Sequence, residues 1–258
     1  MIDRVHKLQR KLNESEELIK TPLATYHNPY LRDPRYLNSP LLDEISRLKL
    51  PELTRTEVEG VTEDLRLKGP LTIRRLIPTE DEAKFIIIPS LGIGGRAISD
   101  HEARLYFDPL NTHVVESLSY WAGREIAHEL NHLTRWQAKI RGKTLLDAFI
   151  FEGLATVYEE HYGNRYQPTL WGQALSKEQI VSEWQKAQQE LDSTDYDRED
   201  WFFGRHHGHP LWTGYALGTA IVQSYSDRHP DESMSQLVRK TSATILRKSG
   251  FSLASEVE

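Results

Sequence analysis

Residues 124–132 read Arg-Glu-Ile-Ala-His-Glu-Leu-Asn-His and place His128 and His132 four positions apart inside a helical pattern. On a helix of about 3.6 residues per turn, both imidazoles project from one face, roughly 40° apart, and can reach a single ion. In the H-E-x-x-H pattern, two neutral imidazoles bind Zn²⁺ and the carboxylate between them takes a proton from the water that the metal activates. The pattern therefore predicts a zinc site with His128 and His132 as ligands and Glu129 as general base.

A third ligand is predicted on the helix that follows. Residues 141–143 interrupt the helical run, and a second apolar segment at 144–162 predicts two antiparallel helices joined by a short turn. His132 lies ten residues before Gly142 and Glu152 lies ten after it. Because each residue rises about 1.5 Å along a helix, the two side chains should lie at the same level. Glu152 is therefore the predicted third ligand.

Two alternatives to this site have to be weighed. Asp147 is the rival carboxylate, but it lies five residues nearer the turn than Glu152. Glu152 is also the sole ionised residue in the segment 148–155, where a lone carboxylate is costly unless it is paired or bound to a cation. Two histidines at this spacing can also arise by chance on an ordinary surface helix. The zinc site is favoured because Glu152 is expected at the same height as His132.

Composition limits the class of protein and its partners. The chain of 258 residues is 38% hydrophobic, and 32 basic against 38 acidic residues give a net charge of −6, which argues against a nucleic-acid partner. Because there is no cysteine, a metal must be held by His, Asp or Glu. The first twenty residues lack the apolar core of a secretory signal, and no apolar run approaches the roughly 18 residues of a membrane span. These features predict a cytoplasmic protein with no membrane partner.

Periodicity predicts a helical extension at residues 1–70 and a compact catalytic domain at 71–258. Short β-branched runs predict strands at 71–77 and 84–88, and the strand-like run 103–107 is expected to form a hairpin with residues 94–98. Beyond the two metal-binding helices, we expect helices at 176–192, 211–225 and 231–258, with residues 193–200 as an acidic connection.

Residues 92–97 read Gly-Ile-Gly-Gly-Arg-Ala and match G-x-G-x-x-A, a dinucleotide-binding pattern. That pattern needs a helix directly after it, whose amides meet the pyrophosphate. The strand-like run 103–107 follows instead, so nucleotide binding is the less favoured alternative.

A histidine-dense loop at 205–210 could be a second metal site, a donor to an oxyanion, or a polar surface turn. Attack on a carbonyl develops negative charge on oxygen, which an aimed His or Tyr can stabilise. His209 and Tyr215 are the candidates for this role. Tyr215 could equally be an ordinary core aromatic.

His128, Glu129, His132 and Glu152 together resemble the gluzincin metalloproteases, and their spacing matches the thermolysin-like pattern. The resemblance implies an α+β, zincin-like fold that is mainly helical, with a small mixed sheet packed on the active-site helix and substrate along an edge strand. A broader likeness to the bacterial YjaZ-like family of predicted zinc-dependent proteases rests on residues 91–95, 128–132, 135, 152–155 and 210–218.

The sequence departs from the thermolysin-like pattern at Thr156, four residues after Glu152, where an aspartate would brace a zinc ligand. Glu125 and Glu159 are candidate substitutes for that aspartate.

These features predict a zinc-dependent metallopeptidase that acts on a peptide or protein substrate. One alternative is a zinc hydrolase that acts on a non-peptide amide or ester. Another is a non-catalytic regulatory module with a structural zinc, closed by a fourth side chain such as His209 or His161. Cleavage specificity and oligomeric state are left open by the sequence.

Overall fold

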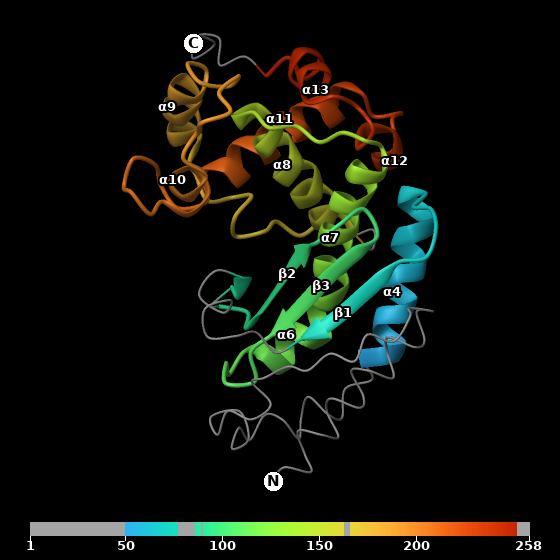
Figure 1. Ribbon diagram of the computed structural model, residues 1–258. Helices are drawn as coiled ribbons and strands as arrows, with labels where there is room; N and C mark the ends of the chain where they lie inside the picture. Colours follow the sequence, from blue (N-terminus) through green and yellow to red (C-terminus); the bar gives the residue numbers. More distant parts are fainter. Residues whose placement is uncertain (1–49, 77–85, 89, 163–165, 252–258) are drawn as a thin grey trace. The chain divides into compact units, whose positions relative to one another are not determined.

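The computed structural model of the chain describes residues 50–76, 86–88, 90–162 and 166–251 (Figure 1). The chain forms two compact units, residues 1–133 and 134–258. Because residues 1–49 lie outside the described ranges, the predicted N-terminal extension and its boundary at residue 70 stay predictions.

The described part of the first unit holds a three-stranded mixed sheet in the order β1-β3-β2. The central strand β3 (Glu102–Phe107) runs parallel to β1 (Thr72–Leu76) and antiparallel to β2 (Ile93–Ala97). The hairpin predicted from the sequence is confirmed. The G-x-G-x-x-A pattern lies on β2 and leads into β3 rather than into a helix. Residues 86–88, the described part of the other predicted strand, contribute only an isolated bridge from Ile88 to Ile93.

The helix that carries the two histidines is shorter than the sequence suggests. The helical run that the sequence predicts around the two histidines is divided into α6 (Val114–Tyr120) and α7 (Ala122–Gln137). The backbone of Trp121, between them, has φ −96° and ψ −16°, away from regular helical values. A third helix, α4 (Leu50–Leu65), precedes the sheet. The apolar stripe of α7 is fully buried at Ile126, Leu130 and Leu133, as its periodicity predicts.

The second unit is helical in its described residues. Its elements are α8 (Leu145–His161), α9 (Lys177–Ala187), α10 (Arg198–Phe203), α11 (Thr213–Arg228), α12 (Met234–Leu237) and α13 (Ser242–Ser249). In the described part of the expected tail helix, residues 231–251, the chain forms two short helices, and the last one ends at Gly250.

Helices α8 and α11 approach each other through two glycines. A Cβ atom placed on Gly153 would lie 2.2 Å from the carbonyl carbon of Gly218, and one placed on Gly218 would lie 2.0 Å from the carbonyl oxygen of Phe149. No side chain fits either position without moving a backbone. This contact fixes the part of α8 that carries Glu152, and the apolar core of the unit forms around both helices.

Asp147 begins α8 rather than serving as a metal ligand. Its Oδ2 accepts hydrogen bonds from the backbone N–H of Lys143 and from the N–H and hydroxyl of Thr144, and its Oδ1 accepts one from the Ser242 hydroxyl at 2.6 Å. Burial alone would raise the pKa of Asp147, but the hydrogen bonds from Ser242 and Thr144 lower it below its usual value. The rival carboxylate is therefore fully engaged in a capping box.

Arg135, one turn after His132, is fixed by the segment near the C-terminal helix. Its side chain is buried, with the whole residue 2% exposed. It donates to the carbonyls of Val238 and Lys240 at 3.2 and 2.9 Å and to the Ser242 hydroxyl at 2.9 Å. Burial lowers the pKa of this guanidinium to about 10. The last turn of α7 is thus tied to residues far along the chain.

Replacing Arg135 with Met should destabilise the protein by about 3 kcal/mol, because it leaves buried carbonyls without their charged donor. For a chain of this size, the melting temperature should fall by about 6–12 °C, measured by differential scanning calorimetry. Arg247→Met, at an exposed position of α13, serves as control and should change little. Equal melting temperatures for Arg135→Met and the wild type would contradict this account.

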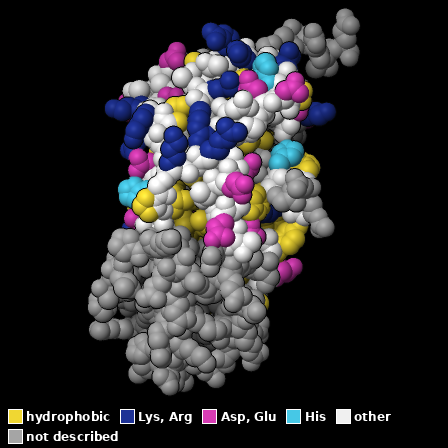
Figure 2. All heavy atoms as spheres, turned by 90° about the vertical axis from the view of Figure 1, so that its right-hand side faces the viewer, with side chains coloured by type: hydrophobic (Ala, Val, Ile, Leu, Met, Phe, Trp, Pro, Cys, Tyr) yellow, Lys and Arg dark blue, Asp and Glu magenta, His cyan; other side chains and the backbone are white. Residues whose placement is uncertain are grey.

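The surface carries charge of both signs. On the face shown in Figure 2, several Lys and Arg side chains lie together with Asp and Glu side chains beside them. Across the described residues, no helix has both the length and the hydrophobicity that crossing a bilayer requires.

Candidate metal centre

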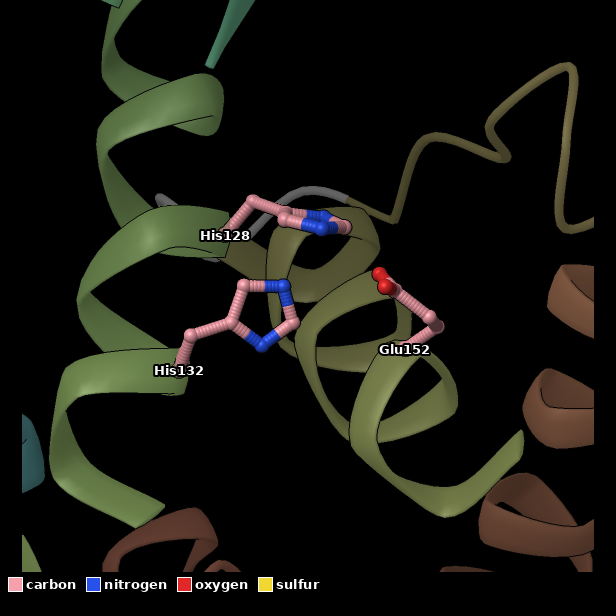
Figure 3. Close-up of side chains that lie close together, drawn as sticks. All are labelled: His128, His132 and Glu152. Carbon is pink, nitrogen blue, oxygen red and sulfur yellow. The ribbon is translucent and has the colours of Figure 1, made fainter. Parts of the chain in front are cut away.

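Helix α7 presents the two histidines side by side. The ring centroids of His128 and His132 lie 4.8 Å apart, with the ring planes at 87°. This is the placement that a four-residue spacing on a helix predicts. Both side chains project from the same face of the helix (Figure 3).

Glu152, on α8, points its carboxylate toward the two imidazoles (Figure 3). One ligand atom from each of His128, His132 and Glu152 lies within 4.8 Å of the other two. This grouping supports the choice of Glu152 made from equal distances to the turn, and its role as a ligand stays a prediction. Asp147, engaged in the cap of α8, is not part of this group.

The donor set fits a zinc ion. The three residues are 8%, 5% and 5% exposed, so three ionisable groups are gathered away from water. A buried carboxylate is costly unless a cation or a hydrogen-bond donor compensates its charge. Two imidazoles and one carboxylate form a common protein ligand set for Zn²⁺. Among the described residues, His128, His132 and Glu152 are the one group of at least three His, Asp or Glu side chains that could hold a metal ion.

Glu129 lies between the histidines on α7 and faces strand β2. A Cβ atom placed on Gly95 would lie 2.5 Å from Oε1 of Glu125 and 2.6 Å from Oε1 of Glu129. Both carboxylates therefore meet at one point of β2, where only a glycine leaves room for them. The neighbouring Gly94 packs closely against the backbone of Ile86. A Cβ atom placed on Gly94 would lie 2.0 Å from the carbonyl oxygen of Ile86. The Gly-Gly pair thus allows the strand to cover the predicted base closely.

His209 is engaged in contacts away from the group of three. Its Nδ1 lies 2.7 Å from Oε2 of Glu183, and its ring stacks on Trp201 with centroids 3.5 Å apart. The rest of the histidine-dense loop is held by Asp200, which accepts from the backbone N–H groups of His206 and Gly208. Within the described ranges this loop forms no metal-binding group. The role of His209 as an oxyanion donor stays a prediction.

Tyr215 lies in the first turn of α11, where its ring packs edge-on against Phe202 at 5.2 Å. Phe202 also carries the guanidinium of Arg198, 4.4 Å from its ring centroid. Tyr215 is therefore near the arginine that contacts Glu152. Its catalytic role stays a prediction as well.

Arg198 was not identified from the sequence. Its Nη2 donates a hydrogen bond to Oε1 of Glu152 at 2.8 Å. Desolvation alone would lower the pKa of Arg198, but the charge of Glu152 and the hydrogen bond to it raise this pKa above its usual value. Arg198 is the first residue of α10, and it lies inside residues 193–200, which the sequence predicts to be an acidic connection. The usable signals were Asp197, which caps the helix, and Gly204, which ends it in the left-handed conformation.

The fold and the site together define a mainly helical α+β protein with a buried metal-binding group of two histidines and one glutamate. Residues 62–247 match the family described as predicted Zn-dependent protease (DUF2268), and the chain therefore belongs to this family. The family and the ligand group agree on Zn²⁺ as the cofactor. The chain matches no curated protein and no solved structure. The family relation expected from the sequence is confirmed, while the gluzincin assignment stays a prediction.

Proposed function

We propose that this protein is a zinc-dependent metallopeptidase of the gluzincin type, with His128, His132 and Glu152 as ligands and Glu129 as general base. The observation that carries the proposal is the buried group of three ligands on two neighbouring helices. Membership in a family of predicted Zn-dependent proteases supports it.

The proposed chemistry divides into the work of the metal and the work of the chain. When bound, Zn²⁺ would lower the pKa of a water molecule to about 7 and polarise the substrate carbonyl. Glu129 accepts the proton of the attacking water and passes it to the leaving amine. Tyr215 or His209 stabilises the negative charge that develops on the carbonyl oxygen. The close cover of β2 over Glu129 restricts the movement of this carboxylate.

The number of ligands supports a catalytic site over a structural one. Structural zinc sites usually have four protein ligands, whereas catalytic sites have three and leave one position for water. The group formed by the described residues has three members. A hydrolase acting on a non-peptide amide or ester would use the same ligands and the same base. The choice of a peptide substrate therefore rests on the family alone.

Metal removal tests the proposal directly. We expect the purified protein to contain about one zinc ion per chain by elemental analysis, since one ligand group is present. Treatment with a chelator should abolish cleavage of an unstructured protein substrate, and added Zn²⁺ should restore it. His132→Ala should lose both zinc and activity, whereas His101→Ala, at an exposed turn, should keep both.

The same assay separates the alternatives. Zinc-dependent cleavage of small amides or esters without cleavage of peptides would favour the non-peptide hydrolase. Stable zinc without turnover of any substrate would favour a structural site.

A further inference from the structure

Arg198 contacts Glu152 from 46 positions further along the chain. The two partners differ sharply in exposure, because the Glu152 side chain is 6% exposed and that of Arg198 is 44% exposed. The guanidinium thus covers the carboxylate from the solvent side. This arrangement differs from a surface ion pair, in which both partners are free to move in water.

The ring of Phe202 restricts the orientation of the Arg198 guanidinium, in addition to its position. It lies over the ring of Phe202, with Cζ 4.4 Å from the centroid, and Phe202 itself is fully buried. Gly214 of α11 allows this ring to pack, since a Cβ there would lie 2.6 Å from it. A planar cation on a rigid ring loses little conformational freedom when it binds a carboxylate.

The helix that carries Arg198 is rigid at both ends. Asp197 caps α10 by accepting a hydrogen bond from the backbone N–H of Asp200 at 3.1 Å. Gly204 ends the helix in the left-handed conformation, and the carboxylate of Asp200 then binds the following loop through the N–H of Gly208. Arg198, as the first residue of this capped turn, is held in place by local structure that does not depend on Glu152.

A carboxylate has two oxygens, and Arg198 occupies one of them. The hydrogen bond is made to Oε1 of Glu152, a member of the group of three side chains that could hold a metal ion. Partners of this kind orient a ligand and are typically worth about 10–100-fold in metal affinity. Thr156, where the thermolysin-like pattern has an aspartate, cannot provide a charged contact of this type.

We propose that Arg198 is a positioning residue for the metal centre, which holds the carboxylate of Glu152 through Oε1 in the orientation that a zinc ligand needs. The proposal rests on the proposed function, since it assumes that Glu152 is a zinc ligand. It also explains how this chain braces the ligand without the aspartate expected at position 156.

The test is the zinc affinity of Arg198→Met, measured by competition with a chromophoric chelator. Methionine keeps the packing on Phe202 but removes the donor, so we expect the dissociation constant to rise by about 10–100-fold. Arg198→Lys restores a charge without the planar guanidinium and should recover part of the affinity. The matched control is Arg205→Met, because Arg205 also pairs with a glutamate, Glu199, at 2.7 Å and also lies over a phenylalanine, Phe203. This control should bind zinc like the wild type.

A second measurement separates positioning from a general loss of structure. The metal-free Arg198→Met protein should still unfold in one cooperative transition, at a lower temperature than metal-free Arg205→Met because buried Glu152 loses its donor, and the increase in melting temperature caused by zinc should be smaller than in Arg205→Met. Unchanged zinc affinity in Arg198→Met would overturn the proposal, and so would an equal loss of affinity in both variants. Failure of the wild type to bind zinc would instead overturn the proposed function itself.

Discussion

Glu129→Gln should lower kcat/KM for peptide cleavage by about 10²–10⁴-fold while leaving one zinc ion bound per chain. Glutamine has nearly the same shape as glutamate, but its amide cannot accept a proton at neutral pH. Glu129 stands outside the group of three ligands, so its replacement should leave metal binding intact. Activity and zinc content would be measured on the same purified sample, by cleavage of a fluorogenic peptide and by elemental analysis.

The control for this variant is Glu116→Gln, at an exposed position of α6, which should retain full activity. Cleavage at the wild-type rate by Glu129→Gln would exclude this residue as general base. Loss of zinc along with activity would indicate that Glu129 acts on the metal site rather than on the proton.

Gly153→Ala should destabilise the second unit by about 3 kcal/mol and weaken zinc binding at the same time. The added methyl group meets the backbone of Gly218 at 2.2 Å, so α8 and α11 must separate. Overpacking of this kind typically costs about 1–3 kcal/mol and more where backbone has to move. Because Glu152 is the adjacent residue, the shift also displaces a ligand. Calorimetry and zinc titration of the same variant measure both effects.

The matched control is Gly123→Ala in α7. A Cβ there would meet only the carboxylate of Glu57, at 2.9 Å, and the end of that side chain can move aside. Alanine is also the better helix former by about 1 kcal/mol, so this variant should be neutral or slightly stabilising. If Gly153→Ala behaved in the same way, the close approach of α8 and α11 would not be what positions Glu152.

The three candidate ligands could be predicted from the sequence because their placement depends on the regular repeat of a helix and on the position of one turn. The spacing of His128 and His132 follows from the helical repeat, and the level of Glu152 follows from the position of the turn at Gly142. The choice of Glu152 over Asp147 also agrees with the structure, in which Asp147 caps α8. The hairpin of β2 and β3 was predicted from the strand-like run at 103–107 and the short connection that precedes it, a second form of local order.

Contacts between distant segments were not predictable in the same way. Arg198 reaches Glu152 from a six-residue helix whose acidic first turn looked like a connection. The interruption at Trp121 leaves no mark in the hydrophobic pattern, since α6 and α7 keep nearly the same repeat on either side. Of the strand expected at 84–88, the described residues 86–88 form only an isolated bridge, because apolar, β-branched composition alone does not provide a neighbouring strand to pair with.

The hydrogen bonds of Arg135 also set an order of events during protein synthesis. Its carbonyl acceptors belong to Val238 and Lys240, more than one hundred positions later in the chain. While the ribosome has not yet released those residues, the guanidinium one turn beyond His132 lacks its buried partners. The side-chain anchoring of this turn can therefore be completed only after most of the second unit has been synthesised.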